Sequence, residues 1–336
     1  MKFSIIIPVR ALNDFIKESV AEIKKLQYSE FETIIVVDSP TDYNFEDSRF
    51  QVLSSGSISP GEKRNLGAKA ATGDILVFLD DDAFPASDWL LEASKIFENP
   101  EVYALGGPAI TPFNASLLER ISGRVLESFL VSGGTTYRHK VTKERFINDY
   151  PTVNLFVRKD AFIKVGGFSS EFWPGEDTKL CLDLVDYYKR PFIYSPKPVV
   201  FHHRRNLFRP YLKQISRYGM YRGRFARVFP QTSRLPMYFI PSLFLIFAVY
   251  GAPLSVLFSP FTWIYKYIMG IYLLFVLIES FRAYFKDSNP ASLFLFFFGA
   301  ILTHIVYGFN FIIGFVVKPK LQLKSVDTKT GNYNEG

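Results

Sequence analysis

The first 110 residues alternate short apolar runs with segments in which apolar residues recur every three or four positions. The runs predict strands at residues 3–9, 31–38, 49–55 and 75–79. Helical spacing predicts one helix after an N-cap at Asn13 and another over 61–73, closed by Gly73. Because the strands are apolar throughout rather than alternating, both faces of the sheet are covered. The pattern predicts an α/β fold with a Rossmann-like, mostly parallel sheet.

Beyond Pro100 the pattern is looser, and each element is predicted from its own composition. Apolar runs at 102–110 and 150–157 predict strands, and helical spacing predicts helices at 114–131 and 176–190. Residues 132–148 are polar and are expected to form a mobile loop, and residues 190–203 are expected to be extended.

Two long stretches near the C-terminus contain no Asp, Glu, Lys or Arg, namely 235–265 and 291–317. Each exceeds the ~20 residues that cross ~30 Å of hydrocarbon. A shorter apolar segment lies between Lys266 and Glu279. The predicted transmembrane region, 235–317, therefore has spans at about 237–258, 263–279 and 293–317. Three spans place the polar tail, 318–336, outside the cell, and two keep it in the cytosol.

Residues 206–234, just before the first span, are strongly basic. Arg209, Lys213 and Arg217 recur every four residues, while Phe208 and Ile215 lie on another side of the same helix. This predicts a basic amphipathic helix in the membrane interface, with a solvated linker helix as the alternative. By the positive-inside rule, the basic residues place the preceding domain in the cytosol. We therefore expect a multi-pass protein of the cytoplasmic (inner) membrane.

Charge and cysteine content restrict the partners and the compartment. The formal net charge of +7 fits contact with phosphates or with anionic membrane lipids. No basic run has the context of a nucleic-acid reader, so DNA and RNA are not expected as partners. Cys181 is the only cysteine, which excludes an internal disulfide and suits a reducing cytosol. The opening MKFSIIIPVR is too short an apolar run for a signal peptide, so we expect the chain to start in the cytosol.

The stretch DILVFLDDDAFP places three carboxylates directly after a buried strand. Asp80 and Asp82 are two residues apart, so both face the same way in an extended segment, while Asp81 turns aside. Two oxygen ligands at the carboxyl end of a parallel strand suit Mg²⁺ or Mn²⁺. The alternative is a solvated acidic turn.

Other candidate residues lie at comparable positions in the chain. Asp38 ends a strand, where its carboxylate can accept an N–H from a nucleotide base. Lys63 and Arg64 open the next helix, and its N-terminus favours a bound diphosphate.

Carboxylates and histidines in the second half of this region complete the candidate set. Glu176 and Asp177 start a helix, as N-caps or as a general base. A histidine pair, His202 and His203, ends an extended segment and can supply a metal ligand. The arginines that follow, Arg204 and Arg205, suit phosphate binding or form a surface basic patch.

The order SIIIPVR, IIVVDSP, GEKRNLGAKAATGDILVFLDDDAFP, GGF and GEDTKL resembles the family-two glycosyltransferases of GT-A fold over residues 1–205. The basic segment and the spans that follow resemble membrane-bound members that make exopolysaccharides or lipid-linked glycans. The resemblance implies a GT-A catalytic domain at 1–205.

The resemblance also implies roles for individual residues. Nucleotide contacts are expected from Pro8, Val9, Arg10, Asp38, Arg64, Asp80 and Asp81. A metal ion, Mn²⁺ or Mg²⁺, is expected on Asp82, Asp80 and His202, with His203 as the alternative histidine. Asp177 is expected to be the general base, with Glu176 beside it. Acceptor contacts are expected from Asn154, Trp173, Arg204 and Arg205.

The implied reaction moves a sugar from a nucleoside diphosphate, expected to be UDP, to a hydroxyl of a lipid-linked or polysaccharide acceptor. Direct displacement inverts the anomeric configuration. The segment QISRYG only approximates the Gln-x-x-Arg-Trp motif of processive synthases, which argues against repeated chain extension. Two alternatives stay open: a polyprenyl-phosphate sugar synthase, whose acceptor needs no base, and an inactive membrane scaffold of the same fold.

Overall fold

The computed structural model describes residues 1–172 and 174–317. The described residues divide into two compact units, the first formed by residues 1–110 and 140–202 and the second by 111–139 and 203–317. The first unit therefore ends at His202 rather than at residue 205. Residues 111–139 leave it because their helices pack in the core of the second unit. The predicted polar tail, 318–336, lies outside the described residues.

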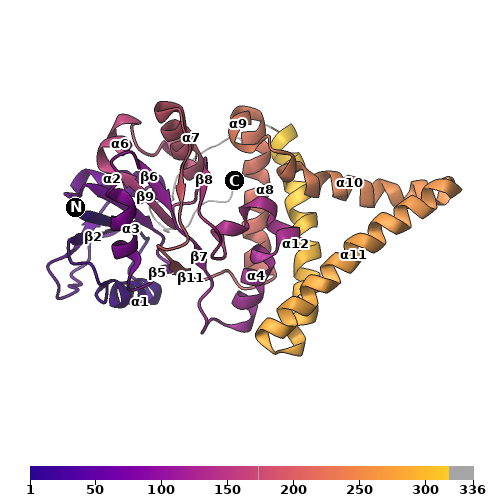
Figure 1. Cartoon of the computed structure of the whole chain (residues 1–336), viewed down its shortest axis with the longest axis horizontal. Helices are drawn as coiled ribbons and strands as arrows, with labels where there is room; N and C mark the ends of the chain where they lie inside the picture. The colour runs from indigo at the N-terminus through magenta and orange to yellow at the C-terminus, as the bar shows by residue number, and fades with distance from the viewer. Residues whose placement is uncertain (173, 318–336) are drawn as a thin grey trace. The chain divides into compact units, whose positions relative to one another are not determined.

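The first unit begins with the strand–helix repeats that the apolar pattern predicts (Figure 1). These elements are β1 (Phe3–Pro8), α1 (Asp14–Ile23), β2 (Phe31–Val37), β3 (Phe50–Ser54), α2 (Pro60–Ala70) and β4 (Ile75–Leu79). Asn13 is the N-cap of α1, as predicted, because its side chain accepts a hydrogen bond from the backbone N–H of Ile16 at 2.9 Å.

Shorter elements complete the first unit. They are β5 (Ala83–Pro85), α3 (Trp89–Phe97), β6 (Ala104–Gly106), β7 (Ala109–Ile110), β8 (Arg145–Ile147), β9 (Asn154–Arg158), α6 (Lys159–Lys164), η2 (Ser170–Phe172), α7 (Glu176–Tyr188), β10 (Phe192–Tyr194) and β11 (Val200–His202). The main sheet has the order β3-β2-β1-β4-β9-β6-β10-β8, and a small sheet has the order β5-β11-β7. Within the main sheet, only β8 and β9 run opposite to the other strands, so it is mostly parallel, as predicted.

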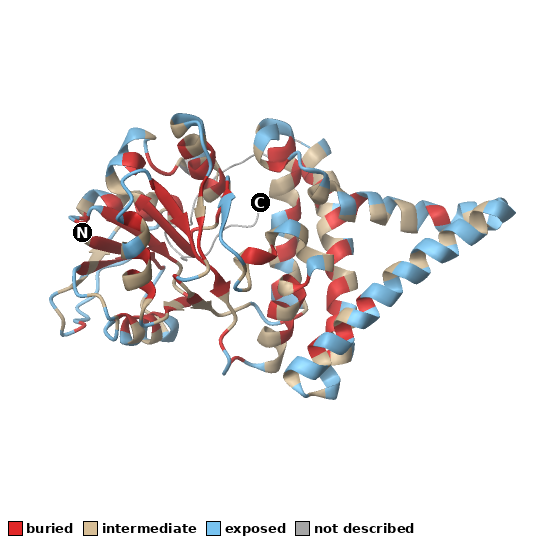
Figure 2. Cartoon of the chain, viewed as in Figure 1, coloured by how far each residue is buried: buried red, intermediate tan, exposed pale blue. Residues whose placement is uncertain are grey.

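The centre of this sheet forms the core of the first unit (Figure 2). Every residue of β1 and β4 is buried, which confirms that helices and loops cover both faces. Trp89 of α3 packs on Phe156 of β9, with ring centroids 5.2 Å apart. Because β1 to β4 are parallel, their carboxyl ends meet at one edge of the sheet, where Asp38 and Asp80 follow directly.

Two local predictions about the helices are wrong. Helix α2 ends at Ala70, and Ala71 is already extended, so Gly73 does not cap it. Gly73 instead allows close approach of the chain, because a Cβ there would lie 2.7 Å from the carbonyl oxygen of Lys2. The predicted helix over 114–131 is two helices, α4 (Leu117–Glu127) and α5 (Phe129–Ser132), with a break at the extended Ser128.

The mobile loop predicted over residues 132–148 is also wrong. This segment contains a 3₁₀ helix, η1 (Gly133–Arg138), and the edge strand β8. Strand β8 pairs antiparallel with β10, so backbone hydrogen bonds hold a stretch whose polar composition suggested a loop. Strand β8 has only three residues and lies among polar residues, so no apolar run in the sequence marks it.

The second unit contains the remaining helices. After α4, α5 and η1 come α8 (Arg209–Val228), α9 (Pro230–Ser233), α10 (Pro236–Leu257), α11 (Ser259–Asp287) and α12 (Pro290–Val316). The helices α10, α11 and α12 are long and apolar enough to cross a membrane, and they cover the three predicted spans. Helix α11 is longer at both ends than the predicted span, because it continues past Lys266 and Glu279.

Glu32 ties β2 to β1 and to the turn after α2. Its carboxylate accepts hydrogen bonds from the Ser4 hydroxyl at 2.6 Å, from Thr72 through both its backbone N–H and its hydroxyl, and from Lys2. Burial alone would raise the pKa of Glu32, but these hydrogen bonds outweigh it and lower the pKa to about 2.

We expect Glu32→Gln to lower the free energy of unfolding at pH 7 by on the order of 1–2 kcal/mol. Because the pKa is lowered in the folded state, this stabilisation is complete above about pH 4.5 and is lost as the pH falls towards about 2. Urea unfolding in detergent, followed by near-ultraviolet circular dichroism, should therefore show a difference between variant and wild type that shrinks with acidification. The exposed neighbour Glu30→Gln serves as the control, and a pH-independent difference for Glu32→Gln would contradict this role.

Candidate active site

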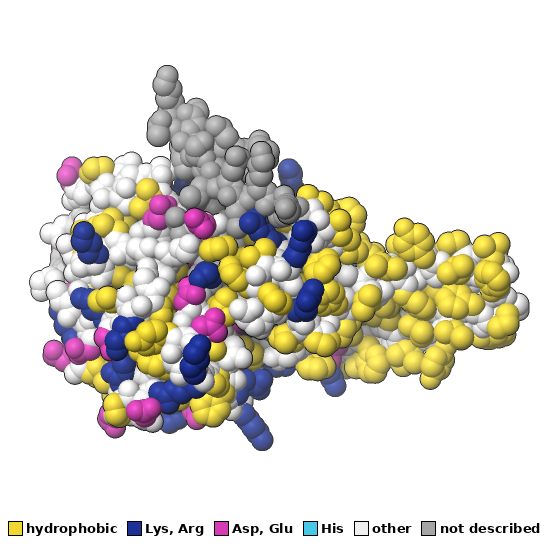
Figure 3. Space-filling model, turned by 90° about the horizontal axis from the view of Figure 1, so that it is seen from above, with side chains coloured by type: hydrophobic (Ala, Val, Ile, Leu, Met, Phe, Trp, Pro, Cys, Tyr) yellow, Lys and Arg dark blue, Asp and Glu magenta, His cyan; other side chains and the backbone are white. Residues whose placement is uncertain are grey.

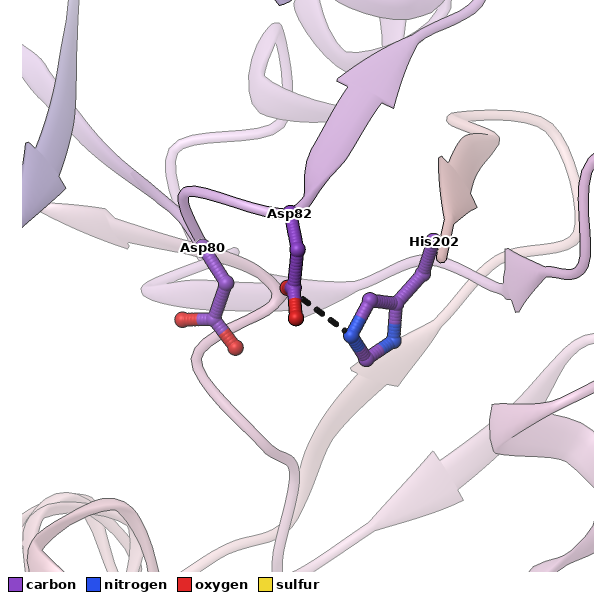
Figure 4. A group of neighbouring side chains, drawn as sticks. All are labelled: Asp80, Asp82 and His202. Carbon is purple, nitrogen blue, oxygen red and sulfur yellow. Dashed lines mark ion pairs between the residues drawn. The ribbon is translucent and has the colours of Figure 1, made fainter. Parts of the chain in front are cut away.

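Three candidate metal ligands come together at the edge of the sheet (Figure 4). Strand β4 ends at Leu79, and Asp80 and Asp82 follow it. Strand β5 then begins at Ala83, which pairs with His202 in the antiparallel β5–β11 ladder. This register brings the His202 Nε2 atom to 3.0 Å from the Asp82 Oδ1 atom. Ligand atoms of Asp80, Asp82 and His202 all lie within 4.8 Å of one another.

The donor set of this group suits a divalent cation. Two carboxylates and one imidazole offer oxygen and nitrogen ligands, and the side chains are only 30%, 9% and 13% exposed for Asp80, Asp82 and His202. Mg²⁺ prefers oxygen ligands alone, whereas transition metals accept imidazole readily, so the set fits Mn²⁺ better. The structure also separates the two histidines, because His203 belongs to the second unit and its Nδ1 atom lies 3.2 Å from Glu119 Oε1.

Arg64 joins the metal-ligand group to the start of α7. Its guanidinium donates to Asp80 Oδ1 at 2.7 Å and to Glu176 Oε1 at 3.1 Å, and the side chain is only 5% exposed. The sequence predicted that Arg64 approaches a diphosphate. In the structure two of its nitrogens are bonded to carboxylates, so it balances the charge of the acidic cluster and fixes the position of both acids.

Glu176 and Asp177 begin α7 but have different surroundings. Glu176 is buried against Arg64, and burial raises the pKa of its carboxyl although the guanidinium opposes that change. Asp177 is half-buried, and its Oδ1 atom accepts the backbone N–H of Thr178 at 2.7 Å. Gly175, with φ of 120°, makes the sharp entry into the helix that a residue with a Cβ would resist. Of the two acids, Asp177 is the more accessible to a reactant.

Asn65 links α2 to the loop that contains the GGF sequence. Its side chain donates to the carbonyl oxygen of Phe168 at 2.8 Å and accepts the N–H of the same residue at 2.9 Å. Gly167 has φ of +74°, and a Cβ there would lie 2.7 Å from the Asn65 Oδ1 atom. The sequence analysis did not assign Asn65 a role, although it stands beside Arg64 in the same motif.

A second ionic contact lies at the ends of β1 and β2. The Lys63 ammonium group donates to the Asp38 carboxylate and to the Val9 carbonyl, and its side chain is only 4% exposed. Arg10 Nε lies 4.0 Å from the other carboxylate oxygen of Asp38. Lys63 was expected near a diphosphate, but the structure shows it holding Asp38. In the sequence, only its position directly before Arg64 indicated that Lys63 belongs to the site.

The remaining nucleotide candidates lie nearby. Pro8 is the last residue of β1, and Val9 follows it, buried. Asp81 turns away from its two neighbours, as predicted, and the Asn13 side chain donates to it at 3.4 Å. The roles of these residues in nucleotide binding stay predictions.

The acceptor-binding prediction for Asn154 does not fit the structure. Asn154 is wholly buried; it accepts from Trp89 Nε1 at 2.9 Å and donates to the carbonyl oxygens of Pro108 and Pro198. These bonds commit its side chain to holding the fold together. Trp173 lies outside the described residues. Arg204 and Arg205 belong to the second unit, so their predicted contact with an acceptor stays a prediction.

We expect Mn²⁺ to bind the purified full chain in detergent with one site, observable by electron paramagnetic resonance titration of free Mn²⁺. Asp82→Asn and His202→Gln each remove a ligand and should weaken binding by at least about tenfold. His203→Gln is the matched control, because its imidazole lies beside Glu119 instead, and it should bind like wild type. Equal affinities in all four proteins would contradict the site.

Comparison with known proteins relates the sequence to glycosyltransferases. Residues 4–166 match the sequence model of the family described as Glycosyl transferase family 2. The chain is 28% identical over 224 residues to the pre-mycofactocin glycosyltransferase of Mycobacterium tuberculosis, a match that covers 64% of this chain and 46% of that protein. It thus spans about half the length of that relative. It is 24% identical over 220 residues to the glucosyl-dolichyl phosphate glucuronosyltransferase of Haloferax volcanii, covering 60% and 69% of the two chains.

A solved structure shares the fold. The mannosyltransferase PcManGT from Pyrobaculum calidifontis, in complex with GDP-Man and Mn²⁺, superposes with a TM-score of 0.53 at 15% identity. The match covers 93% of this chain and 86% of that one. At this level of identity the likeness concerns the fold.

Proposed function

Residues 4–166 belong to glycosyl transferase family 2, whose GT-A fold the first unit has, and from this premise we propose which reaction the enzyme carries out. It transfers a sugar from a nucleoside diphosphate to a hydroxyl of a lipid-linked or polysaccharide acceptor, with inversion of the anomeric configuration. We expect UDP as the carrier, with GDP as the alternative, because a carboxylate such as Asp38 can accept an N–H from either base.

One observation carries this proposal. Arg64 contacts Asp80 of the metal-ligand group and Glu176, the neighbour of Asp177, at the same time. A single buried guanidinium therefore fixes the candidate metal site and the candidate base relative to each other. A sugar whose diphosphate lay at Asp80 and Asp82 would place its anomeric carbon near the start of α7. Such an arrangement is what a one-step displacement requires.

The metal-ligand group would hold the diphosphate end of the donor. Asp80, Asp82 and His202 would ligate Mn²⁺, which when bound neutralises the charge that develops on the departing nucleoside diphosphate. The Mn²⁺ in the PcManGT complex supports this choice of metal. Lys63 keeps the Asp38 carboxylate in one place, ready to accept an N–H from the base. Arg64 holds Asp80 in position and offsets part of the negative charge of the cluster.

Asp177 would act as the general base. It removes the proton from the acceptor hydroxyl as that oxygen bonds to the anomeric carbon, and the bond from that carbon to the diphosphate breaks. The electron pair leaves with the nucleoside diphosphate, and the proton stays on Asp177. Glu176, buried against Arg64, positions the start of α7.

The membrane helices and one relative support a lipid-linked acceptor. Three helices of the second unit are long and apolar enough to cross a bilayer, and the name of the Haloferax volcanii relative contains a dolichyl phosphate carrier. We propose that the chain is anchored in the cytoplasmic membrane with its catalytic unit on the cytosolic side, beside such an acceptor. The basic residues before α10 favour this orientation.

A polyprenyl-phosphate sugar synthase is the nearest alternative, and Asp177 discriminates between the two. A phosphate acceptor is already anionic and needs no base, so Asp177→Asn should leave a synthase active. For transfer to a hydroxyl we expect Asp177→Asn to lower kcat by about 100-fold or more while donor affinity is kept.

The measurement is release of nucleoside diphosphate from a panel of UDP- and GDP-sugars with membrane lipid extract as acceptor. Asp183→Asn is the matched control, since Asp183 is a half-buried acid of the same helix that pairs with Lys179. Full activity of Asp177→Asn would favour the synthase. Failure of the folded wild type to bind any donor would favour the inactive scaffold.

A further inference from the structure

The three apolar helices of the second unit are not equally exposed. Each helix has a most apolar stretch of 18 residues. The buried share of that stretch is 11% in α10 and 6% in α11, but 39% in α12. In α11 three consecutive residues, Leu273, Leu274 and Phe275, are all exposed, and successive residues of a helix point about 100° apart. One side of α11 packs in the core of the second unit through Val276 and Ala283, and its other sides are mostly exposed, as in a helix that faces lipid.

The exposed surface of α10 and α11 is mostly hydrophobic. Figures 2 and 3 show exposed, almost entirely hydrophobic surface over α10 and α11. The two helices meet at Phe258 and form what we call the α10–α11 hairpin, residues 236–287. Helix α10 has 22 residues, which at ~1.5 Å per residue matches the ~30 Å of a hydrocarbon core.

Helix α12 contacts both helices of the hairpin, through Ser242 of α10 and Tyr272 of α11, and it packs in addition on the basic helix α8. The two helices α8 and α12 run parallel, with α8 beside the C-terminal half of α12: Tyr211 near the start of α8 contacts Thr303, and Arg227 near its end contacts Phe315. They approach closely at glycines: a Cβ on Gly219 would lie 2.5 Å from the carbonyl oxygen of Tyr307. A Cβ on Gly223 would lie 2.1 Å from that of Phe311, a separation that excludes any side chain there.

Polar contacts at both ends of α8 join it to α12. The Tyr211 hydroxyl lies 3.1 Å from the Thr303 hydroxyl, and both are buried. Arg227 donates to the carbonyl oxygens of Phe315 and Val316 in the last turn of α12, at 3.2 and 3.1 Å. Wherever α12 lies relative to a bilayer, α8 must therefore lie beside it.

The composition of α8 excludes it from the hydrocarbon core. It carries cationic side chains in every part of its length: Arg209, Lys213, Arg217, Arg222, Arg224 and Arg227. With 20 residues it is long enough to span, yet it is not among the helices apolar enough to do so. Each cationic group within the hydrocarbon would be costly, and six on one helix would be prohibitive. The same constraint applies to α12, because the two helices are packed together.

The outward face of α12 is a single apolar stripe. Its exposed large side chains are Phe294, Phe298, Ile305, Phe309 and Val316. These positions lie within about 60° of one another around the helix. One apolar stripe beside a basic partner helix is the pattern of a helix in the membrane interface.

We infer that the α10–α11 hairpin enters the bilayer, while α12 lies with α8 in the interface and does not cross. Helix α10 leaves from beside the C-terminal half of α12, where Pro241 lies against Gly308, and α11 returns to the N-terminal end of α12 at Ser288. Figure 1 shows the two helices converging away from α12. The near end of α11 carries Asp287, which binds Arg120 and Arg124 of α4, so this end lies outside the hydrocarbon. The chain then has two spans, and both ends of α12 lie on one side of the membrane.

The inference concerns the second unit and does not rest on the transferase chemistry. Its test measures the depth of nitroxide labels in the bilayer on full-length protein reconstituted into phosphatidylethanolamine–phosphatidylglycerol vesicles. Single cysteines replace Phe294, Phe298, Ile305 and Phe309 on α12, and Leu274 on α11, in a Cys181→Ser background. Depth is measured from the relative relaxation of each label by oxygen and by a water-soluble nickel chelate, so mixed orientations of the protein do not matter.

We expect the four labels on α12 to lie at one shallow depth and the label at Leu274 to lie deep. A depth profile that rises from residue 294 to a maximum between 298 and 305 and falls again at 309 would show that α12 crosses, and it would overturn the inference. A shallow label at Leu274 would also overturn it, because the hairpin would then lie outside the bilayer. Because four positions on α12 are labelled, the depth profile can still be interpreted if one variant does not fold.

Discussion

The candidate site depends on one buried cation. Several carboxylates converge where the parallel strands end, and crowded carboxylates repel one another unless positive charge lies between them. Arg64 supplies part of that charge, since its guanidinium bonds to Asp80 and to Glu176 in a nearly solvent-free position. Removing a buried partner of this kind leaves uncompensated charge, which is far more costly than losing an exposed ion pair. The acids therefore keep the geometry that a metal and a diphosphate need.

The fold explains why these residues meet. Asp38 and Asp80 follow parallel strands and so lie at one edge of the sheet, while α2 begins at the same edge and brings Lys63 and Arg64 to them. His202 arrives from far along the chain through the small sheet, where its pairing with Ala83 sets it beside Asp82. Each side chain is positioned by a strand end or a helix start, so the site is built on rigid elements.

Much of the fold and of the candidate site could be predicted from the sequence, because the patterns that indicate them lie within short stretches of the chain. The strands around the site are continuous apolar runs, and the acids follow them directly, so the fold and the pairing of Asp80 with Asp82 at a strand end were predictable from their positions. Lys63 and Asn65 were missed as positioning residues because their partners, Asp38 and Phe168, lie far away in the chain. Asn154 was placed in the acceptor cleft for the same reason: its bonds to Trp89, Pro108 and Pro198 exist only in the folded chain. Apolar length alone likewise left open whether the chain has two spans or three, and our inference that α12 does not cross depends on its packing with α8.

The most direct test of this account is calorimetric binding of UDP and of GDP to the full chain in detergent, with and without Mn²⁺. The account predicts that one of the two nucleotides binds, that binding requires Mn²⁺, and that Asp38→Ala weakens it without removing the requirement for metal. Binding that is indifferent to Mn²⁺, or no binding of either nucleotide by well-folded protein, would contradict the claim that Asp80, Asp82 and His202 hold a metal and a diphosphate together.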